Sequence, residues 1–227
     1  MRTAISLTYE RPDALPAPFT DDDVRTPPAL VERCLAEHTD PGDVVLDPFA
    51  GFGTTLRVAT ELDRRAYGVE LEERRVAYIR EQGNHGTVIH GDARDLAALD
   101  LPAVDCVYTS PPFMVEGMPA DPLQNYDGDT DYADYLDDVR DVFARVRELL
   151  RPGGHVLVDV SNMKYDEQVT TLAWDLADAI RRELHFEGEV VVSWEPGDDV
   201  NEYAEAQEGT FGYGYDHSYV LVFGAPE

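Results

Sequence analysis

A nine-residue segment, DPFAGFGTT at positions 47–55, constrains the fold of this chain more than any other feature. It follows a short apolar run at 44–46, which is typical of a buried strand, and it leads into a helical pattern over 54–62. A strand followed by an acid, a glycine-rich turn and a helix places backbone N–H groups and the positive helix end around a ligand. Glycine allows the backbone to approach that ligand closely. The segment therefore predicts a cofactor-binding turn at the carboxyl edge of a sheet.

The remaining apolar patterns alternate between strand and helix periodicity. Strand patterns cover residues 44–46, 67–70, 87–90, 104–108, 155–160, 190–194 and 219–223. Helical patterns cover residues 27–38, 54–62, 72–82, 132–150 and 169–184. This alternation predicts an α/β fold with a mostly parallel sheet and helices on both faces. The last two strands have no helical pattern between them, so we expect the final strand to be antiparallel.

The length of 227 residues suits a single domain with a sizeable core. Residues 1–26 are rich in proline and acid and are predicted to form an irregular arm, whereas residues 27–227 are predicted to form one domain. Neither a signal peptide nor an apolar run of about 20 residues is visible in the sequence. We therefore expect a cytoplasmic protein that does not enter the membrane.

The charge is unusual, with 46 acidic and 18 basic residues and a net charge of −28. Every basic residue except Lys164 is an arginine, and the acids are spread along the whole chain. This pattern favours a folded protein with the acidic, lysine-poor surface of an extreme halophile, because at molar salt the Debye length is only about 3 Å. The alternative is an acidic protein from a non-halophilic organism that avoids nucleic acid, since a net charge of this sign repels phosphates.

No metal site is predicted. Cys34 and Cys106 both lie in apolar runs, so we expect two buried thiols and neither a disulfide nor a metal ligand pair. Alternating aspartates at 127–131 mimic the start of a calcium-binding loop, but Tyr132 stands where such a loop needs glycine.

Three acids follow three successive predicted strands, namely Asp47, Glu70 and Asp92. A dinucleotide-binding turn would have a third glycine three residues after Gly53, where this chain has Leu56. S-adenosylmethionine (SAM) carries no pyrophosphate and does not need that glycine. We therefore expect Asp47 near the sulfonium or ammonium end of SAM, Glu70 on the ribose hydroxyls and Asp92 on the adenine amino group. For any one acid alone, an ordinary surface position is the alternative.

A second short block, Thr-Ser-Pro-Pro-Phe at 109–113, follows the fourth predicted strand. Proline has no N–H, fixes φ and holds the preceding residue extended. The Ser110 hydroxyl and the Pro111 carbonyl can therefore accept hydrogen bonds from an exocyclic amine, whose lone pair is otherwise delocalised into its ring. Pro112 belongs to the same catalytic loop, and Phe113 would stack on a base swung out of its helix. An ordinary turn is the alternative.

DPFAGFGTT, the upstream stretch TPPALVER at 26–33 and the SPPF loop resemble, in this order, the motifs of the SAM-dependent DNA amino methyltransferases, the DNA methylase N-4/N-6 family. The resemblance covers nearly the whole chain from Pro27 onward. It implies the class I methyltransferase fold, which is Rossmann-like, with seven strands of which the last is antiparallel. It implies cofactor contacts from Thr26, Asp47, Pro48, Phe49, Gly51, Gly53, Thr54, Thr55, Glu70 and Asp92. The family commonly has lysine where this chain has Thr26.

In that family, Ser-Pro-Pro before an aromatic residue is associated mostly with cytosine N4. Asp-Pro-Pro and Asn-Pro-Pro are associated with adenine N6, guanine N2 or protein glutamine. Ser110 therefore implies methylation of cytosine N4, most simply in DNA. The DNA enzymes usually carry a target-recognition region that this chain lacks, so methylation of ribosomal-RNA cytidine N4 stays open, as does a partner subunit for recognition. Further alternatives are a non-catalytic SAM-binding subunit and methylation of glutamine or of a small molecule.

Two loops, 114–130 and 195–218, are the candidate surfaces for reading nucleic acid. The second contains four aromatic residues, Tyr203, Phe211, Tyr213 and Tyr215. Aromatic side chains stack readily on unpaired bases. Packing against the edge of the sheet is the equally plain alternative for these four residues.

Overall fold

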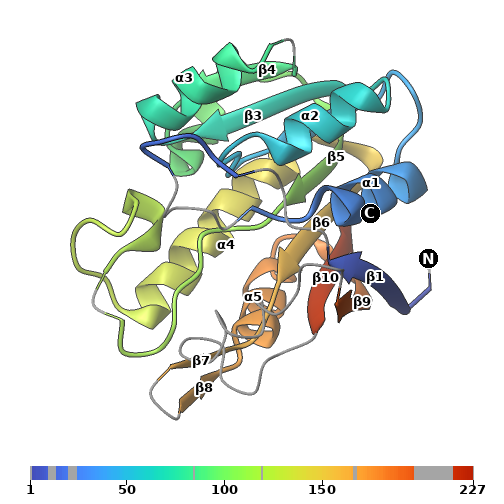
Figure 1. Cartoon of the computed structure of the whole chain (residues 1–227). Coiled ribbons are helices and arrows are strands. Elements are labelled where there is room, and N and C mark those ends of the chain that lie inside the picture. The colour runs from blue at the N-terminus through green and yellow to red at the C-terminus, as the bar shows by residue number, and fades with distance from the viewer. Residues whose placement is uncertain are drawn as a thin grey trace.

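The computed structural model describes residues 2–9, 14–19, 25–83, 85–118, 120–165, 168–196 and 217–226. An eight-stranded sheet forms its centre, in the order β1-β9-β10-β6-β5-β2-β3-β4 (Figure 1). Its strands are β1 (Ala4–Tyr9), β2 (Val44–Asp47), β3 (Arg65–Glu70), β4 (Thr87–His90), β5 (Val104–Thr109), β6 (Leu150–Val160), β9 (His185–Pro196) and β10 (His217–Gly224). A separate ribbon pairs β7 (Met163–Tyr165) with β8 (Gln168–Thr170).

Helices cover both faces of the sheet. The α-helices are α1 (Pro28–His38), α2 (Thr54–Glu61), α3 (Glu73–Glu81), α4 (Tyr132–Leu149) and α5 (Leu172–Ile180), with short 3-10 turns η1 (Ala93–Ala98) and η2 (Pro122–Gln124). The buried side chains of α1, α2 and α3 pack on one face, and those of α4 and α5 pack on the other. Strand β10 is antiparallel to both of its neighbours, while every other pair in the sheet is parallel. The predicted α/β fold with an antiparallel last strand is confirmed.

The sheet has eight strands where seven were expected, because the first strand comes from the arm. Residues 1–26 were predicted to be irregular, but Ala4–Tyr9 pairs parallel with β9, with Ile5 opposite Val192 and Leu7 opposite Trp194. Ile5 and Leu7 pack against the buried cluster below that edge of the sheet. Their alternation with polar residues is a strand signal, which the proline-rich composition of the arm hid.

The predicted helix at 169–184 was also partly wrong. Helix α5 spans only Leu172–Ile180, and the preceding Gln168–Thr170 pairs antiparallel with Met163–Tyr165. Val169 and Thr170 are β-branched, and such side chains fit an extended strand better than a helix. The buried residues Leu172, Leu176 and Ile180 of α5 keep helical spacing, which is why the rest of the prediction was right.

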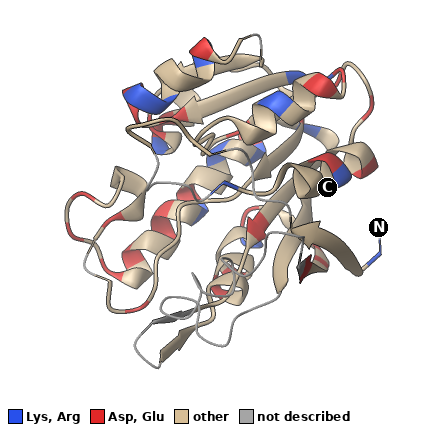
Figure 2. Cartoon of the chain, in the orientation of Figure 1, with Lys and Arg blue, Asp and Glu red and all other residues tan. Residues whose placement is uncertain are grey.

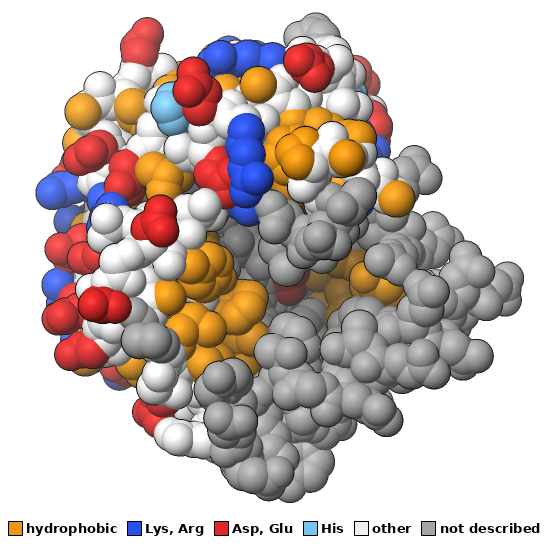
Figure 3. Space-filling view, turned by 60° about the vertical axis from the view of Figure 1, so that its left-hand side comes forward, with side chains coloured by type: hydrophobic (Ala, Val, Ile, Leu, Met, Phe, Trp, Pro, Cys, Tyr) orange, Lys and Arg blue, Asp and Glu red, His pale blue; other side chains and the backbone are white. Residues whose placement is uncertain are grey.

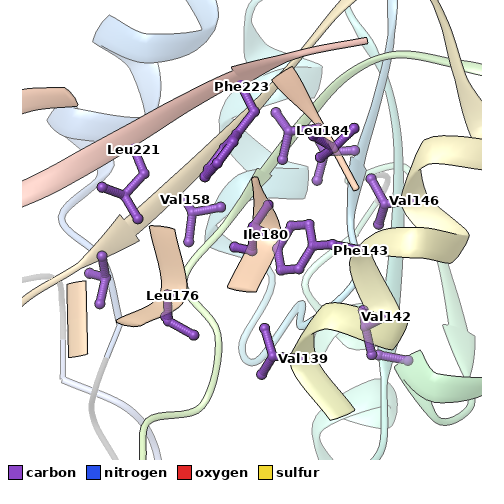
Figure 4. Packing of buried hydrophobic residues seen from close by; sticks show 14 of the residues in the cluster. Val139, Val142, Phe143, Val146, Val158, Leu176, Ile180, Leu184, Leu221 and Phe223 are labelled. Atoms are coloured by element: carbon purple, nitrogen blue, oxygen red, sulfur yellow. The ribbon is translucent and has the colours of Figure 1, made fainter. Parts of the chain in front are cut away.

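The core consists of two layers, one on each face of the sheet. Along β6 the layers alternate, since Val156 and Val158 belong to the layer under α4 and α5, whereas Leu157 belongs to the other. In the first layer Phe143 of α4 packs near Ile180 of α5 (Figure 4). Each fully buried side chain of this kind contributes about 1.5–3 kcal/mol relative to an exposed one. The larger layer thus fixes the sheet against α4, the helix that follows the predicted catalytic loop.

Acidic residues are spread over the helices and loops, as Figure 2 shows. Several arginines pair with acids one helical turn away, for example Arg57 with Glu61 at 2.8 Å and Arg140 with Asp137 at 2.7 Å. Cys34 and Cys106 are free and buried, as predicted, and burial raises the pKa of both thiols. Among the described residues, no helix has both the length and the apolar character needed to cross a bilayer.

Candidate active site

The order of the strands reverses between β2 and β5, at the centre of the sheet. From β2 the chain continues to β3 and β4 on one side, and from β5 it continues to β6 on the other. In open α/β sheets, ligands bind in the crevice outside the carboxyl ends of the strands at such a reversal. Asp47 ends β2 and Thr109 ends β5, so the two sequence blocks meet at this point.

A cavity of about 510 Å³ lies at this edge. With the exception of Gly53, all the residues predicted for cofactor binding and catalysis line it: Thr26, Asp47, Pro48, Phe49, Gly51, Thr54, Thr55, Glu70, Asp92, Ser110, Pro111, Pro112 and Phe113. Figure 3 brings this side of the molecule forward and shows hydrophobic side chains gathered beside a hollow, with many acidic side chains toward the rim of the view. The cavity therefore joins both predicted blocks in one site.

Asp47 holds the two blocks together. Its side chain is only 4% exposed, and it accepts hydrogen bonds from the Thr109 hydroxyl at 2.7 Å and the Phe49 N–H at 3.0 Å. Burial raises the pKa of Asp47, against the opposing effect of hydrogen bonds from the Thr55 and Thr109 hydroxyls and the Phe49 N–H. The contact with Thr109 fixes the start of the catalytic loop relative to the cofactor turn.

The two glycines of the turn have different tasks. Gly51 lines the cavity with φ +55°, a backbone conformation that a side chain rarely adopts. Gly53 caps α2 with φ +82° and does not line the cavity. A Cβ on Gly53 would lie 3.0 Å from Cγ1 of Ile79, so this glycine allows α2 and α3 to pack closely. Gly53 therefore stands at the cap of α2, and its predicted cofactor contact stays a prediction.

Glu70 at the end of β3 is anchored to the same turn. Its carboxylate, 6% exposed, accepts from the N–H of Gly51 at 2.8 Å and from the N–H of Glu72 at 2.9 Å. Burial raises the pKa of Glu70, although those hydrogen bonds and the nearby Arg75 oppose it. A carboxylate has about four acceptor positions, so Glu70 can also accept hydrogen bonds from a ligand in the cavity.

Asp92 follows β4 and begins η1. It accepts from the backbone N–H of Arg94 at 2.9 Å and from the Arg94 guanidinium at 2.6 Å. Partial burial opposes ionisation, but these contacts with Arg94 hold the pKa of Asp92 below its usual value. Arg94 also lies 3.9 Å from Asp121 and 3.5 Å from Asp138, so it connects the cofactor side of the cavity to the loop after β5.

Among the described residues, two carbonyl groups of the predicted catalytic loop are engaged by tyrosines, and one is not. The Pro112 carbonyl accepts from the Tyr135 hydroxyl of α4 at 2.9 Å, and the Phe113 carbonyl accepts from the Tyr126 hydroxyl at 3.2 Å. Within the described part of the chain, the Ser110 hydroxyl and the Pro111 carbonyl have no hydrogen-bonding partner. Two tyrosines thus hold the loop, and the two acceptors proposed from the sequence stay available at the cavity.

Several lining residues were not predicted, and they come from the arm, from α3 and from the loop after β5. They include Arg25, Glu72, Arg74, Arg75, Leu123, Asn125 and Tyr126. Arg75 lies over the Phe52 ring at 5.0 Å and pairs with Glu72 at 3.3 Å, so it braces the cofactor turn. The available sequence signal for Arg75 was its position in a predicted helix shortly after Glu70. The aromatic residues proposed between 195 and 218 lie outside the described residues.

Comparisons with known proteins agree with this geometry. A family model described as DNA methylase matches residues 21–81 and 104–227. The chain belongs to this DNA methylase family. The type II methyltransferase M.BglII from Bacillus subtilis is 49% identical over 47 residues, which cover 21% of this chain and 13% of that protein. M.XycI from Xanthomonas campestris pv. cyanopsidis is 43% identical over 65 residues, or 28% of this chain and 22% of that protein. The chain thus matches less than a quarter of the length of these two relatives.

Solved structures show the same fold. TrmN from Thermus thermophilus has a TM-score of 0.62 and 23% identity, covering 96% of this chain and 55% of that one. The precorrin-6y C5,15-methyltransferase from Geobacter metallireducens GS-15 has a TM-score of 0.56 and 14% identity, covering 89% and 90%. The cofactor of this member of the family is S-adenosylmethionine, as predicted. The site fits SAM. Asp47 and Glu70 are buried there, and Leu56, which is 1% exposed, packs at the position where a dinucleotide-binding turn needs glycine.

Proposed function

We propose that this DNA methylase transfers a methyl group from SAM to an exocyclic amino group in nucleic acid, most simply N4 of cytosine in DNA. The observation that carries the proposal is the pair of acceptors after β5. The Ser110 hydroxyl and the Pro111 carbonyl line the cavity without partners among the described residues, next to two carbonyls that tyrosines already hold. A planar amine with two N–H bonds matches two such acceptors.

The chemistry needs acceptors of this kind. The lone pair of a cytosine amine is delocalised into the ring, so the nitrogen is a poor nucleophile. When Ser110 and Pro111 accept its N–H bonds, they favour the tetrahedral nitrogen whose lone pair can react. When bound, the cofactor would supply a methyl group on a sulfonium. The nitrogen gains this methyl group and releases one of its two protons to solvent, and S-adenosylhomocysteine leaves. The protein contributes positioning and electrostatic stabilisation. The hydrogen bond from Thr109 to Asp47 keeps these acceptors in register with the cofactor turn.

The target base would reach the acceptors by leaving its stack. An atom inside a duplex is out of reach of an enclosed cavity, and enzymes that modify bases extrude the nucleotide. Phe113 lines the cavity beside the acceptors and is partly buried against the core, so it offers a fixed ring on which the base can stack. The serine at position 110 supports cytosine N4 over adenine N6, following the family resemblance.

The net charge of −28 bears on the conditions of the reaction. Such a protein repels phosphates at low salt, and the repulsion is screened within about 3 Å at molar salt. We therefore propose that the enzyme acts in a halophilic cytoplasm. A partner subunit that carries basic charge would also reduce the repulsion between the protein and nucleic acid, and the assay described below tests for such a partner.

The test is incubation of the purified protein in molar potassium chloride with tritiated SAM and either unmethylated DNA or ribosomal RNA, followed by digestion to nucleosides. Label in N4-methylcytosine from DNA is the expected result. Label confined to RNA cytidine would replace the DNA substrate with RNA. No label in either pool, with SAM binding intact, would contradict an autonomous nucleic-acid methylase and favour dependence on a partner.

A further inference from the structure

Tyr126 is an exposed aromatic residue on the cavity that the proposed reaction does not yet use. It lies in the loop between β5 and α4, it lines the cavity together with Phe113, and its side chain is 41% exposed. A single exposed aromatic residue is ordinary on a protein surface, but this one lies on the cavity beside Phe113, where an aromatic ring can contact a bound base. Its hydroxyl donates to the Phe113 carbonyl at 3.2 Å, which joins it to the catalytic loop.

The loop around Tyr126 is rigidly organised by Asp121. The Asp121 side chain, with 4% of the residue exposed, accepts from the N–H of Leu123 at 2.9 Å and from the side-chain amide of Gln124 at 2.6 Å. The Tyr126 N–H donates to the Asp121 carbonyl at 2.7 Å, and the Asp121 N–H donates to the Gly128 carbonyl at 3.3 Å. These four hydrogen bonds close a compact turn that presents Tyr126 in a single place.

The backbone conformation at this turn is costly. Asn125 has φ +57° and Tyr126 has φ +62°, both in the left-handed region. Asparagine tolerates that region, but a tyrosine there is uncommon. Non-glycine residues in such conformations concentrate at functional sites, where the surrounding structure holds them against the strain. The hydrogen bonds of Asp121 provide that restraint here.

The two rings form a corner. The centroids of Phe113 and Tyr126 are 6.1 Å apart, and the ring planes are inclined by 63°. A flat base therefore cannot lie face to face with both rings at once. Because Phe113 lies in the same short loop as the two acceptors, separated from Pro111 only by Pro112, and lines the same cavity, a base that stacks on Phe113 can have its amino edge near Ser110 and Pro111. Tyr126 then stands against another edge of the same base.

We propose that Tyr126 is a second base-contacting residue, whose ring closes one side of the pocket and fixes the in-plane rotation of the base stacked on Phe113. This inference rests on the proposed function. With rotation fixed, the amine faces its two acceptors, whereas a base free to turn on Phe113 would present its amine there only part of the time. Tyr126 thus acts on the nucleic acid and not on the cofactor.

The test compares Tyr126→Asn, which removes the ring and still tolerates the left-handed backbone, with Tyr126→Phe, which keeps the ring and loses the hydroxyl. The control is Trp174→Ala, since Trp174 is a similarly exposed aromatic residue, at 43%, away from the cavity. Each protein is assayed for methyl transfer to random-sequence DNA and RNA pools. Each is also titrated with fluorescein-labelled single-stranded DNA by anisotropy and with SAM by calorimetry, and melting temperatures verify folding.

We expect Tyr126→Asn to lower transfer and weaken oligonucleotide binding by about 5- to 150-fold, the range for loss of one aromatic contact with a base. SAM affinity should stay within about twofold, and Trp174→Ala should resemble the wild type. Tyr126→Phe keeps the ring, so it should keep oligonucleotide binding, and any loss of transfer in this variant measures the hydrogen bond from the Tyr126 hydroxyl to the Phe113 carbonyl. Transfer and binding by Tyr126→Asn that match the wild type would overturn the role of Tyr126 while leaving the proposed function standing. Absence of transfer by the wild type to every pool would overturn the proposed function and this inference with it.

Discussion

The cofactor half of the cavity and the base half differ in how their polar atoms are engaged. In the cofactor half, the carboxylates of Asp47, Glu70 and Asp92 already accept hydrogen bonds from backbone N–H groups, and Glu70 accepts from both its own loop and the turn at Gly51. In the base half, Ser110 and Pro111 carry acceptors that have no partner among the described residues. The cofactor half is therefore pre-organised to receive an invariant ligand, whereas the base half keeps its acceptors for the group that reacts.

The sharpest test of this division is Ser110→Ala. Loss of one acceptor at the reacting amine should lower the rate of transfer by about 10²–10³-fold, the usual cost of one such electrostatic contact. SAM affinity should remain within about twofold, because the cofactor half is untouched. Single-turnover kinetics with calorimetry of SAM binding would measure both quantities. A variant that binds SAM poorly, or transfers at the normal rate, would break the comparison.

Asp159 of β6 connects the cofactor half to the rest of the sheet, because Thr26 donates to its carboxylate at 3.2 Å. Burial raises the pKa of Asp159 to about 6, against the opposing hydrogen bonds of Thr26 and Ser218. The folded protein therefore holds this proton more tightly than the unfolded chain. Its contribution to stability is complete below pH 3.8 and is lost as the pH rises through 6.

The loss amounts to about 3 kcal/mol for a shift of this size. Asp159→Asn cannot titrate, so its free energy of unfolding should fall less than that of the wild type between pH 4 and 7. Urea denaturation at several pH values in this interval measures the difference. If both proteins show the same pH dependence, the carboxyl of Asp159 is not buried in the way described.

Glu70→Gln should give the opposite pattern to Ser110→Ala. Hydrogen bonds to a charged group are worth about 1.5–3 kcal/mol, so loss of the charge should weaken SAM binding by roughly 10- to 100-fold. Transfer at saturating SAM should stay close to normal, since the acceptors at the base are intact. Calorimetry and saturation kinetics on the same preparation would show this. A loss of turnover without a loss of affinity would mean that the two halves are not separable.

The smallest expected effect concerns the arm. Phe19 packs edge to face on Phe52 of the cofactor turn at 5.3 Å and on Tyr78 of α3 at 5.6 Å. Aromatic pairs of this kind are worth about 0.5–1.5 kcal/mol. Phe19→Ala should therefore weaken SAM binding by about 2- to 10-fold and leave the affinity for oligonucleotides unchanged. Equal losses for both ligands would show that the arm serves the whole cavity.

The acids of the cofactor half could be placed at one edge of the sheet from the sequence for a physical reason. Asp47 ends β2, Glu70 ends β3 and Asp92 follows β4, and parallel strands bring their carboxyl ends together wherever they pair. Local patterns therefore suffice to place them. Tyr126 gave no such signal, because its position depends on a turn built by Asp121 and on positive φ values at residues that are not glycine.

Two further features depend on contacts between distant parts of the chain. Strand β1 exists because β9, which begins at His185, offers it an edge. The buried carboxyl of Asp159 meets Thr26 from the segment before α1 and Ser218 from β10. In the sequence it is one acid among many in a predicted strand. Only the folded sheet shows that this acid is buried.

The most direct test of the two-half cavity is a crystal structure of the protein with S-adenosylhomocysteine and an oligonucleotide that contains a methylated site identified by nucleoside analysis. We expect the ribose hydroxyls to lie within hydrogen-bonding distance of Glu70. We expect the amine of an extruded base to lie within hydrogen-bonding distance of Ser110 and Pro111. A base amine bound away from these two acceptors, or a ribose away from Glu70, would contradict this expectation.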